Sequence, residues 1–148
     1  MELVVFVGLQ ASGKSTFFHE RFARTHQHVS KDLFPHNRNK NRRQEHLLRA
    51  ALLAGRSVVV DNTSPTPEDR RPLVRLGHEY GAKVIGYFFD ASVSECLRRN
   101  EMREGTARVP DVAIYATAKE LVAPSIEEGF DELLCVRLND SIFEVCEC

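Results

Sequence analysis

Short apolar runs alternate with longer segments of helical spacing along the chain. Four apolar runs and one brief extended piece predict strands, at residues 3–7, 28–30, 57–60, 83–89 and 133–138. The segments between them show helical spacing or begin with a capping residue, and predict helices at residues 15–24, 44–54, 67–80, 93–100 and 111–121. Strands that alternate with helices are typical of a parallel sheet covered by helices. We therefore expect a single α/β domain that spans residues 1–148.

The turn after the first predicted strand carries the pattern G-x-x-x-x-G-K-S, from Gly8 to Ser15. Glycines let the backbone fold tightly around a phosphate chain, and the start of the following helix adds partial positive charge. Lys14 would reach the β- and γ-phosphates, and the Ser15 hydroxyl would join an Mg²⁺ shell. The residues expected to bind the nucleotide are Gly8, Gln10, Ala11, Ser12, Gly13, Lys14, Ser15 and Thr16. The pattern thus predicts the phosphate-binding loop (P-loop) of a nucleoside-triphosphate enzyme, with Mg²⁺ as its cofactor.

Three aspartates, Asp32, Asp61 and Asp90, follow predicted strands, at the edge where parallel sheets bind their ligands. For Asp32, position alone is equally consistent with a general base and with a turn cap. Asp61 ends an apolar run, as an acidic residue of the Mg²⁺ shell does in many phosphate-loop enzymes, although Asp61 and Asn62 are also a common turn pair. Asn62 stands where motor-type ATPases place a water-activating Glu, which favours a transferase.

Arginines gather after the fourth predicted strand. Arg98, Arg99 and Arg103 lie on the predicted helix and its exit. Arg99 and Arg103 would share one face if the helix continues, and could there neutralise charge on a transferred phosphoryl group. The irregular segment 101–110 is typical of a mobile lid, which favours this function over the alternative of a solvated basic face.

A second basic segment, residues 35–43, includes Arg38 and is predicted to be a loop. It could hold an acceptor phosphate or a nucleic-acid backbone, although a solvated loop is the simpler interpretation of the segment taken alone. Its string Asn39-Lys40-Asn41-Arg42 lacks the Asp of the guanine-reading motif Asn-Lys-x-Asp. This argues against a signalling GTPase and leaves both ATP and GTP open as phosphate donors.

The amino-acid composition says less about function than the motifs do. The 148 residues are 43% hydrophobic and 28% charged with a formal net charge of −1, so any attraction to nucleic acid would have to be local. No apolar run reaches membrane-spanning length. Cys135 lies in an apolar run and is expected in the core. Cys146 and Cys148 could hold a metal or oxidise, but two ligands do not make a structural zinc site. We expect a reduced, cytoplasmic protein that contacts no membrane.

Assembled, these residues resemble the kinase module of the polynucleotide 5′-hydroxyl kinases of phage and animal end-healing enzymes. The resemblance runs from Leu3 to about Leu138, nearly the whole chain. Its tracts appear in order and at matching spacing: the P-loop, Ser30-Lys31-Asp32, Asp61-Asn62-Thr63, Pro67 with Arg70-Arg71, Arg99-Asn100 with Arg103, Val109-Pro110, Ala123-Pro124 and Glu128-Gly129-Phe130.

The resemblance implies an adenylate-kinase-like P-loop fold with an arginine-bearing lid at about 101–110. It implies transfer of the γ-phosphate of ATP or GTP to a 5′-hydroxyl end of DNA or RNA. The implied catalytic residues are Lys14, Asp32 as general base, Arg99 and Arg103. The implied acceptor-binding residues are Asp61, Asn62, Arg38 and Arg70. One departure is Pro35, which stands where the phage-type enzyme has an acceptor-binding arginine.

Two other functions stay open. The same chemistry could serve a small-molecule acceptor such as a nucleoside, sugar or antibiotic, or the chain could be a non-catalytic nucleotide-binding module. The chain has no second acidic motif for a phosphatase. A partner end-healing domain on another polypeptide or a homo-oligomer is therefore among its expected partners.

Overall fold

Six strands form one sheet in the order β2–β3–β1–β4–β5–β6, and the computed structural model describes residues 1–148. The strands are β1 (Glu2–Val7), β2 (Gln27–Val29), β3 (Val58–Val60), β4 (Lys83–Phe89), β5 (Glu132–Asn139) and β6 (Ile142–Glu147). The helices are α1 (Lys14–Arg21), α2 (Lys40–Leu53), α3 (Pro67–Glu79), α4 (Val93–Glu101) and α5 (Asp111–Glu120). Single 3₁₀ turns are η1 (Lys31–Leu33), η2 (Gly105–Ala107) and η3 (Ile126–Glu128). β1 to β5 are parallel, so the predicted α/β fold is confirmed, and only β6 runs antiparallel.

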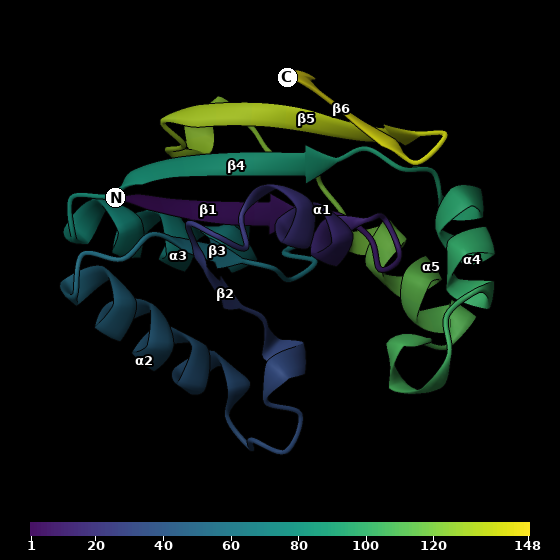
Figure 1. The fold of residues 1–148 in the computed structure, drawn as a ribbon, viewed down its shortest axis with the longest axis horizontal. Coiled ribbons are helices and arrows are strands. Elements are labelled where there is room, and N and C mark those ends of the chain that lie inside the picture. The colour runs from purple at the N-terminus through teal and green to yellow at the C-terminus, as the bar shows by residue number, and fades with distance from the viewer.

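The central strand β1 is buried on both faces, which explains its unbroken apolar sequence. Leu3 and Val5 point to the face that α2 and α3 cover, whereas Val4 and Phe6 point to the face that α1 covers (Figure 1). Side chains alternate along a strand, so the two faces build two separate cores. On the second face, Phe17 and Phe18 of α1 and Phe22, the residue that follows this helix, pack into the core.

Helices α4 and α5 lie together beyond the carboxyl ends of the strands (Figure 1). They enclose a small apolar cluster of Leu9, Ala11, Cys96 and Ile114. Two of these residues belong to the turn after β1, so the cluster fastens that turn to the helical pair. None of the helices has both the length and the apolar composition needed to cross a membrane.

Helix α2 begins at Lys40, earlier than predicted, so the second half of the expected basic loop is helical. Asn39 caps it by accepting a hydrogen bond from the amide of Arg42 at 3.0 Å. The first turn has no apolar position, and hydrophobic spacing therefore missed it. The predicted start of α3 at Pro67 is confirmed, and the preceding residue, Thr66, forms a capping box with Asp69.

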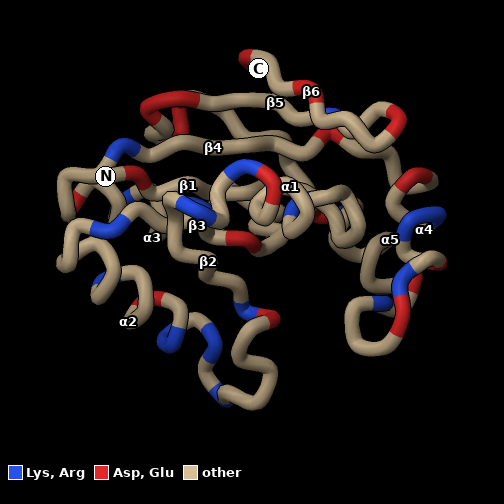
Figure 2. The backbone as a smooth tube through the Cα atoms, in the orientation of Figure 1, with Lys and Arg blue, Asp and Glu red and all other residues tan.

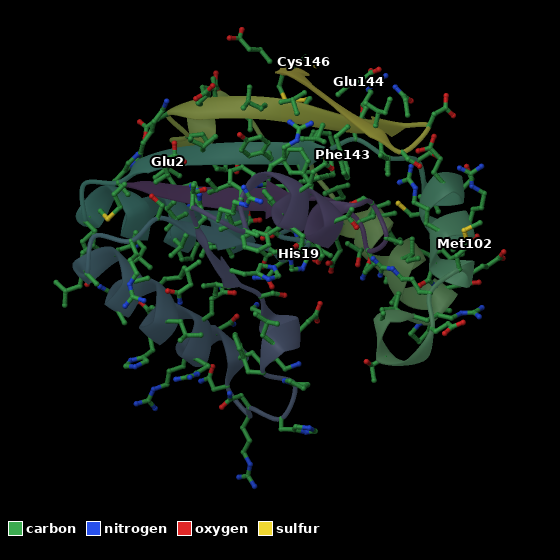
Figure 3. The ribbon with its side chains drawn as sticks, in the orientation of Figure 1. Glu2, His19, Met102, Phe143, Glu144 and Cys146 are labelled. Atoms are coloured by element: carbon green, nitrogen blue, oxygen red, sulfur yellow. A yellow bond between two sulfur atoms is a disulfide. The ribbon has the colours of Figure 1, made fainter.

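The chain ends in a β-hairpin that the sequence patterns did not predict. β5 and β6 are joined by Asp140 and Ser141, whose φ angles are both positive, at 47° and 66°. Two-residue hairpin turns of this kind usually carry glycine, so the turn signal in the sequence is weak. β6 brings Phe143 against Phe17 of α1, with ring centroids 5.0 Å apart, and adds it to the core of that face (Figure 3).

The hairpin also corrects the prediction that Cys135 is a reduced core residue. Cys135 is partly exposed and forms a disulfide with Cys148, with Cα atoms 5.2 Å apart. Cys146, which lies opposite Cys135 in the strand register, is exposed and free. The pairing depends on β6 folding back over β5, which the apolar run around Cys135 does not reveal.

Arg70 is completely buried (0% exposed) and corrects a second expectation, that it binds the acceptor. Its guanidinium donates to both carboxylate oxygens of Glu128, at 2.7 and 3.0 Å, and to the Ser64 carbonyl at 2.9 Å. Burial alone would raise the pKa of Glu128, but the hydrogen bonds from Arg70 and the Ser125 amide outweigh it and lower the pKa. The ion pair joins α3 to η3 and leaves Arg70 no access to a ligand.

We expect Arg70→Ala to lower the free energy of unfolding by about 3–5 kcal/mol, because it leaves the Glu128 carboxylate largely buried without its partner. Urea denaturation at pH 7 measures this value. The matched control is Arg71→Ala, since Arg71 is exposed and forms no ion pair, and its effect should stay within about 0.5 kcal/mol. Equal losses in the two variants would contradict a structural role specific to Arg70.

Candidate active site

The turn between β1 and α1 has the backbone of an anion-binding loop. Ala11 and Gly13 have positive φ angles of 63° and 102°, which curl the chain back toward the start of α1. A Cβ on Gly8 would lie 2.9 Å from Cβ of Phe89, so only glycine fits there. Gly13 is the cap residue of α1 and supplies no side-chain oxygen, so the first amides of the helix are left without a capping partner. These amides are available to an anion.

Lys14 is buried within this loop, with 8% of its surface exposed. Its ammonium donates to the carbonyl oxygens of Gly8 at 3.0 Å and Leu9 at 2.6 Å. Burial lowers the pKa of Lys14 to about 8, partly opposed by the nearby carboxylate of Asp61. Asp32 and Arg103 also act on this pKa, which indicates that charged groups from several segments face the same ammonium.

A cleft of about 1050 Å³ opens beside the loop, at the carboxyl edge of the sheet. It brings together eight of the predicted site residues, namely Gln10, Ala11, Lys14, Ser15, Asp32, Asp61, Asn62 and Arg103. The other four predicted loop residues, Gly8, Ser12, Gly13 and Thr16, are not among the residues that line the cleft. The segments that meet in the cleft are therefore those that sequence reasoning selected, although their chemical roles stay predictions.

Asp61 lies at the end of β3 and is almost fully buried (4% exposed). Its Oδ2 atom accepts the hydroxyl of Ser15 at 2.8 Å and also lies 2.8 Å from Nε2 of His28. Because carboxylate oxygens only accept, the imidazole is the donor of the second bond. Sequence reasoning missed His28, which lies in a strand of three residues that has no hydrophobic period. Only the parallel pairing of β2 with β3 reveals that His28 reaches Asp61.

Asp32 is exposed in η1, and its carboxylate has no hydrogen-bond partner within the protein. The backbone around it is held firmly. The Ser30 hydroxyl accepts the Asp32 amide at 3.3 Å, and Asn62 Oδ1 accepts the Lys31 amide at 3.0 Å. Asn62 also donates to Gln44 at 2.6 Å, so its amide group braces the Asp32 turn. Asn62 therefore supports the Asp32 turn and also lines the cleft, and its contact with the acceptor stays a prediction.

Arg99 and Arg103, the two arginines expected to act on the phosphates, have different surroundings. Helix α4 ends before Arg103, so the two do not share a helical face as the sequence suggested. Arg103 lines the cleft and donates to the Ala107 carbonyl within the lid at 3.1 Å. Arg99 lies on α4 outside the cleft and pairs loosely with Glu95 at 3.8 Å.

Asn100 closes the base of the lid and was recognised from the sequence only as part of a family tract. It is fully buried, donates to the Val109 carbonyl at 2.6 Å and accepts the Val109 amide at 3.1 Å. Both backbone groups of one residue are thereby paired with one amide side chain. The lid therefore leaves and rejoins the fold at a fixed point, while the segment between is exposed.

Arg38 does not line the cleft; it lies in a separate shallow groove with Arg42 and Arg43. The segment 33–44 holds four basic and no acidic side chains, and none of the four forms an ion pair (Figure 2). The other 16 basic residues of the chain are outnumbered by its 21 acidic residues. Positive charge is thus concentrated next to the Asp32 side of the cleft.

Comparisons with known proteins agree with this geometry. A family model described as an AAA domain matches residues 3–124. The bifunctional polynucleotide phosphatase/kinase of Schizosaccharomyces pombe is 26% identical over 136 residues, which cover 87% of this chain and 32% of that protein. The putative bifunctional polynucleotide phosphatase/kinase of Acanthamoeba polyphaga mimivirus is 28% identical over 139 residues, which cover 89% of this chain and 32% of that protein. The chain spans about a third of the length of these curated relatives.

A solved structure of a Pnkp1/Rnl/Hen1 complex contains a similar chain, with a TM-score of 0.57 and 25% identity over 66% of this chain and 38% of that chain. The resemblance inferred from the sequence is confirmed by these matches. With its P-loop, parallel sheet and cleft, the chain belongs to the AAA domain family.

Proposed function

We propose that the chain transfers the γ-phosphate of ATP or GTP to the 5′-hydroxyl end of a DNA or RNA strand. The observation that carries this proposal is the position of Asp32. Its unpartnered carboxylate lines the same cleft as Lys14 and Ser15, next to a basic segment without acidic residues. The names of the relatives, polynucleotide phosphatase/kinases, support a nucleic-acid acceptor.

The donor side of the reaction needs anion binding and a metal. The free amides at the start of α1 and the Lys14 ammonium bind the phosphates, since both place positive charge in the loop. Ser15 Oγ and the Asp61 carboxylate are the hard oxygen ligands that Mg²⁺ prefers. An Mg²⁺ ion held by these two groups would neutralise charge on the phosphates.

On the acceptor side, Asp32 takes the proton of the 5′-hydroxyl as its oxygen attacks the γ-phosphorus. A new bond forms between that oxygen and phosphorus, the bond to the bridging oxygen breaks, and the nucleoside diphosphate leaves. Arg103 faces the cleft and stabilises the negative charge that is shared among the γ-oxygens during transfer. The four basic side chains of segment 33–44 attract the phosphates of the strand that follows the reacting end.

The test of Asp32 is transfer of label from γ-labelled ATP or GTP, in the presence of Mg²⁺, to an oligonucleotide. We expect label on a 5′-hydroxyl oligonucleotide and none on its 5′-phosphorylated twin. Asp32→Asn should lower the rate by about 10²–10⁴-fold while nucleotide affinity stays unchanged, because the proton acceptor is lost and the P-loop is not.

Asp90→Asn is the matched control. Asp90 also follows a strand at the carboxyl edge, but it lies outside the cleft and pairs with Arg137. Full activity of Asp32→Asn would contradict the assigned base. Transfer to a free nucleoside or sugar with none to the oligonucleotide would contradict the nucleic-acid acceptor and select a small-molecule kinase.

The lowered pKa of Lys14 predicts that nucleotide binding takes up protons. Near its pKa of about 8, half of the Lys14 side chains are neutral in the free protein. Bound phosphate favours the charged form, so binding should take up about half a proton per nucleotide at pH 8 and close to none at pH 7. Isothermal titration calorimetry in buffers of different ionisation enthalpy measures this uptake. Lys14→Arg is the control, because arginine stays protonated, and proton uptake that persists in it would contradict the assignment to Lys14.

A further inference from the structure

We propose that His28 is a positioning residue, which holds the Asp61 carboxylate in place. The Ser15 hydroxyl then donates its hydrogen to Asp61, and the lone pairs of its oxygen stay available to the metal of a bound nucleotide. The inference rests on the proposed phosphate-donor site and not on the identity of the acceptor. It starts from the Oδ2 atom of Asp61, which both Ser15 and His28 approach to 2.8 Å.

The direction of the Ser15 hydrogen bond decides what the hydroxyl can do. A hydroxyl has one hydrogen and two lone pairs. Because the carboxylate of Asp61 accepts, the Ser15 hydrogen is committed to it and the lone pairs are turned elsewhere. A carboxylate that rotated away would release this hydrogen, and the oxygen would no longer be oriented toward the cleft. The orientation of Asp61 therefore controls the use of Ser15.

Strand β2 fixes Asp61 at two points. The Asp61 amide donates to the Val29 carbonyl at 2.8 Å, which holds the backbone. His28, the preceding residue of β2, supplies the second point through its side chain. With the backbone and one carboxylate oxygen both held, little rotation is left to the group. Asp61 lines the cleft in this fixed orientation.

His28 is itself held by α1. Its ring stacks on Phe18 with centroids 4.0 Å apart and an angle of 14° between the planes. Phe18 is buried and lies on the helix that carries Ser15, three residues further on, so both side chains are on neighbouring parts of one rigid element. The imidazole thus connects the two elements that supply Ser15 and Asp61. A ring that is stacked on one element and hydrogen-bonded to the other sets their relative position.

Two variants separate hydrogen bonding from packing. His28→Phe keeps an aromatic ring against Phe18 and removes the donor, whereas His28→Gln keeps a donor at similar reach and removes the ring. The matched control is His19→Asn. His19 is exposed, lies 5.7 Å from His28 edge to face, and makes no hydrogen bond to Asp61 (Figure 3).

The measurement is ATP affinity by isothermal titration calorimetry, with Mg²⁺ and with EDTA, which needs no acceptor. We expect His28→Phe to reduce the Mg²⁺-dependent gain in affinity by about 10–100-fold and to leave the affinity in EDTA unchanged. His28→Gln should restore most of the gain, and His19→Asn should match the wild type. In transfer assays, His28→Phe should lower kcat and leave the KM of the acceptor unchanged.

A wild-type response to Mg²⁺ in His28→Phe would overturn the proposal. Equal weakening with Mg²⁺ and with EDTA would also overturn it, because the defect would then lie in the loop as a whole. Equal losses in His28→Phe and His28→Gln would assign the effect to the shape of the ring and would overturn it too. Thermal unfolding of each variant shows that the fold is kept. Failure of the oligonucleotide as acceptor, with these calorimetric results intact, would remove the proposed function and keep the role of His28.

Discussion

The buried ammonium of Lys14 is the constraint on which the rest of the site depends. A charge removed from water is costly unless it is paired, yet Lys14 has no carboxylate within ion-pair distance and is satisfied mainly by the carbonyls of its own loop. The lowered pKa is the visible sign of this partial compensation. A phosphate group would reduce the cost of burying this ammonium, because it supplies the opposite charge. The amides at the start of α1 can donate hydrogen bonds to the same phosphate. The electrostatics of the loop thus favour the binding of a phosphate group.

This arrangement requires a rigid frame, and the sheet supplies it through two-sided burial. β1 leads into the loop and is buried on both faces, so the position of Gly8 follows from the packing of the sheet. β3 delivers Asp61 and β2 delivers the turn of Asp32 to the same edge, since parallel strands end together. The apolar residues of the sheet thus determine where the polar groups of the cleft lie. The hairpin of β5 and β6 extends this frame, with Phe143 against Gly13 and Phe17.

The sequence predicted those features whose cause is local. The P-loop, the strand that leads into it and the start of α3 each depend on residues a few positions apart, and they were predicted correctly. Arg70 was misread because its partner, Glu128, lies 58 residues away, and nothing near Arg70 marks it as buried. The hydrogen bond between Asn62 and Gln44 of α2 was likewise not foreseen, because the two residues lie 18 positions apart. His28 carries no local signal at all, and the disulfide of Cys135 depends on a turn without glycine. Such errors arise wherever a polar side chain is satisfied by a distant segment.

Hydrogen bonds to distant residues also anchor the two ends of the lid. Asn100 binds both backbone groups of Val109, which holds the two ends of the lid together. Gln10 of the P-loop donates to Thr117 of α5 at 2.9 Å, so the helix that follows the lid is also tied to the loop that binds phosphate. Arg103 lies between these fixed points, and its guanidinium donates to the Ala107 carbonyl of the lid itself. A carbonyl is a weaker partner than a phosphate for a guanidinium, because the phosphate bond is assisted by charge. In the proposed mechanism, a bound triphosphate would draw Arg103 inward while the anchored ends of the lid stay in place.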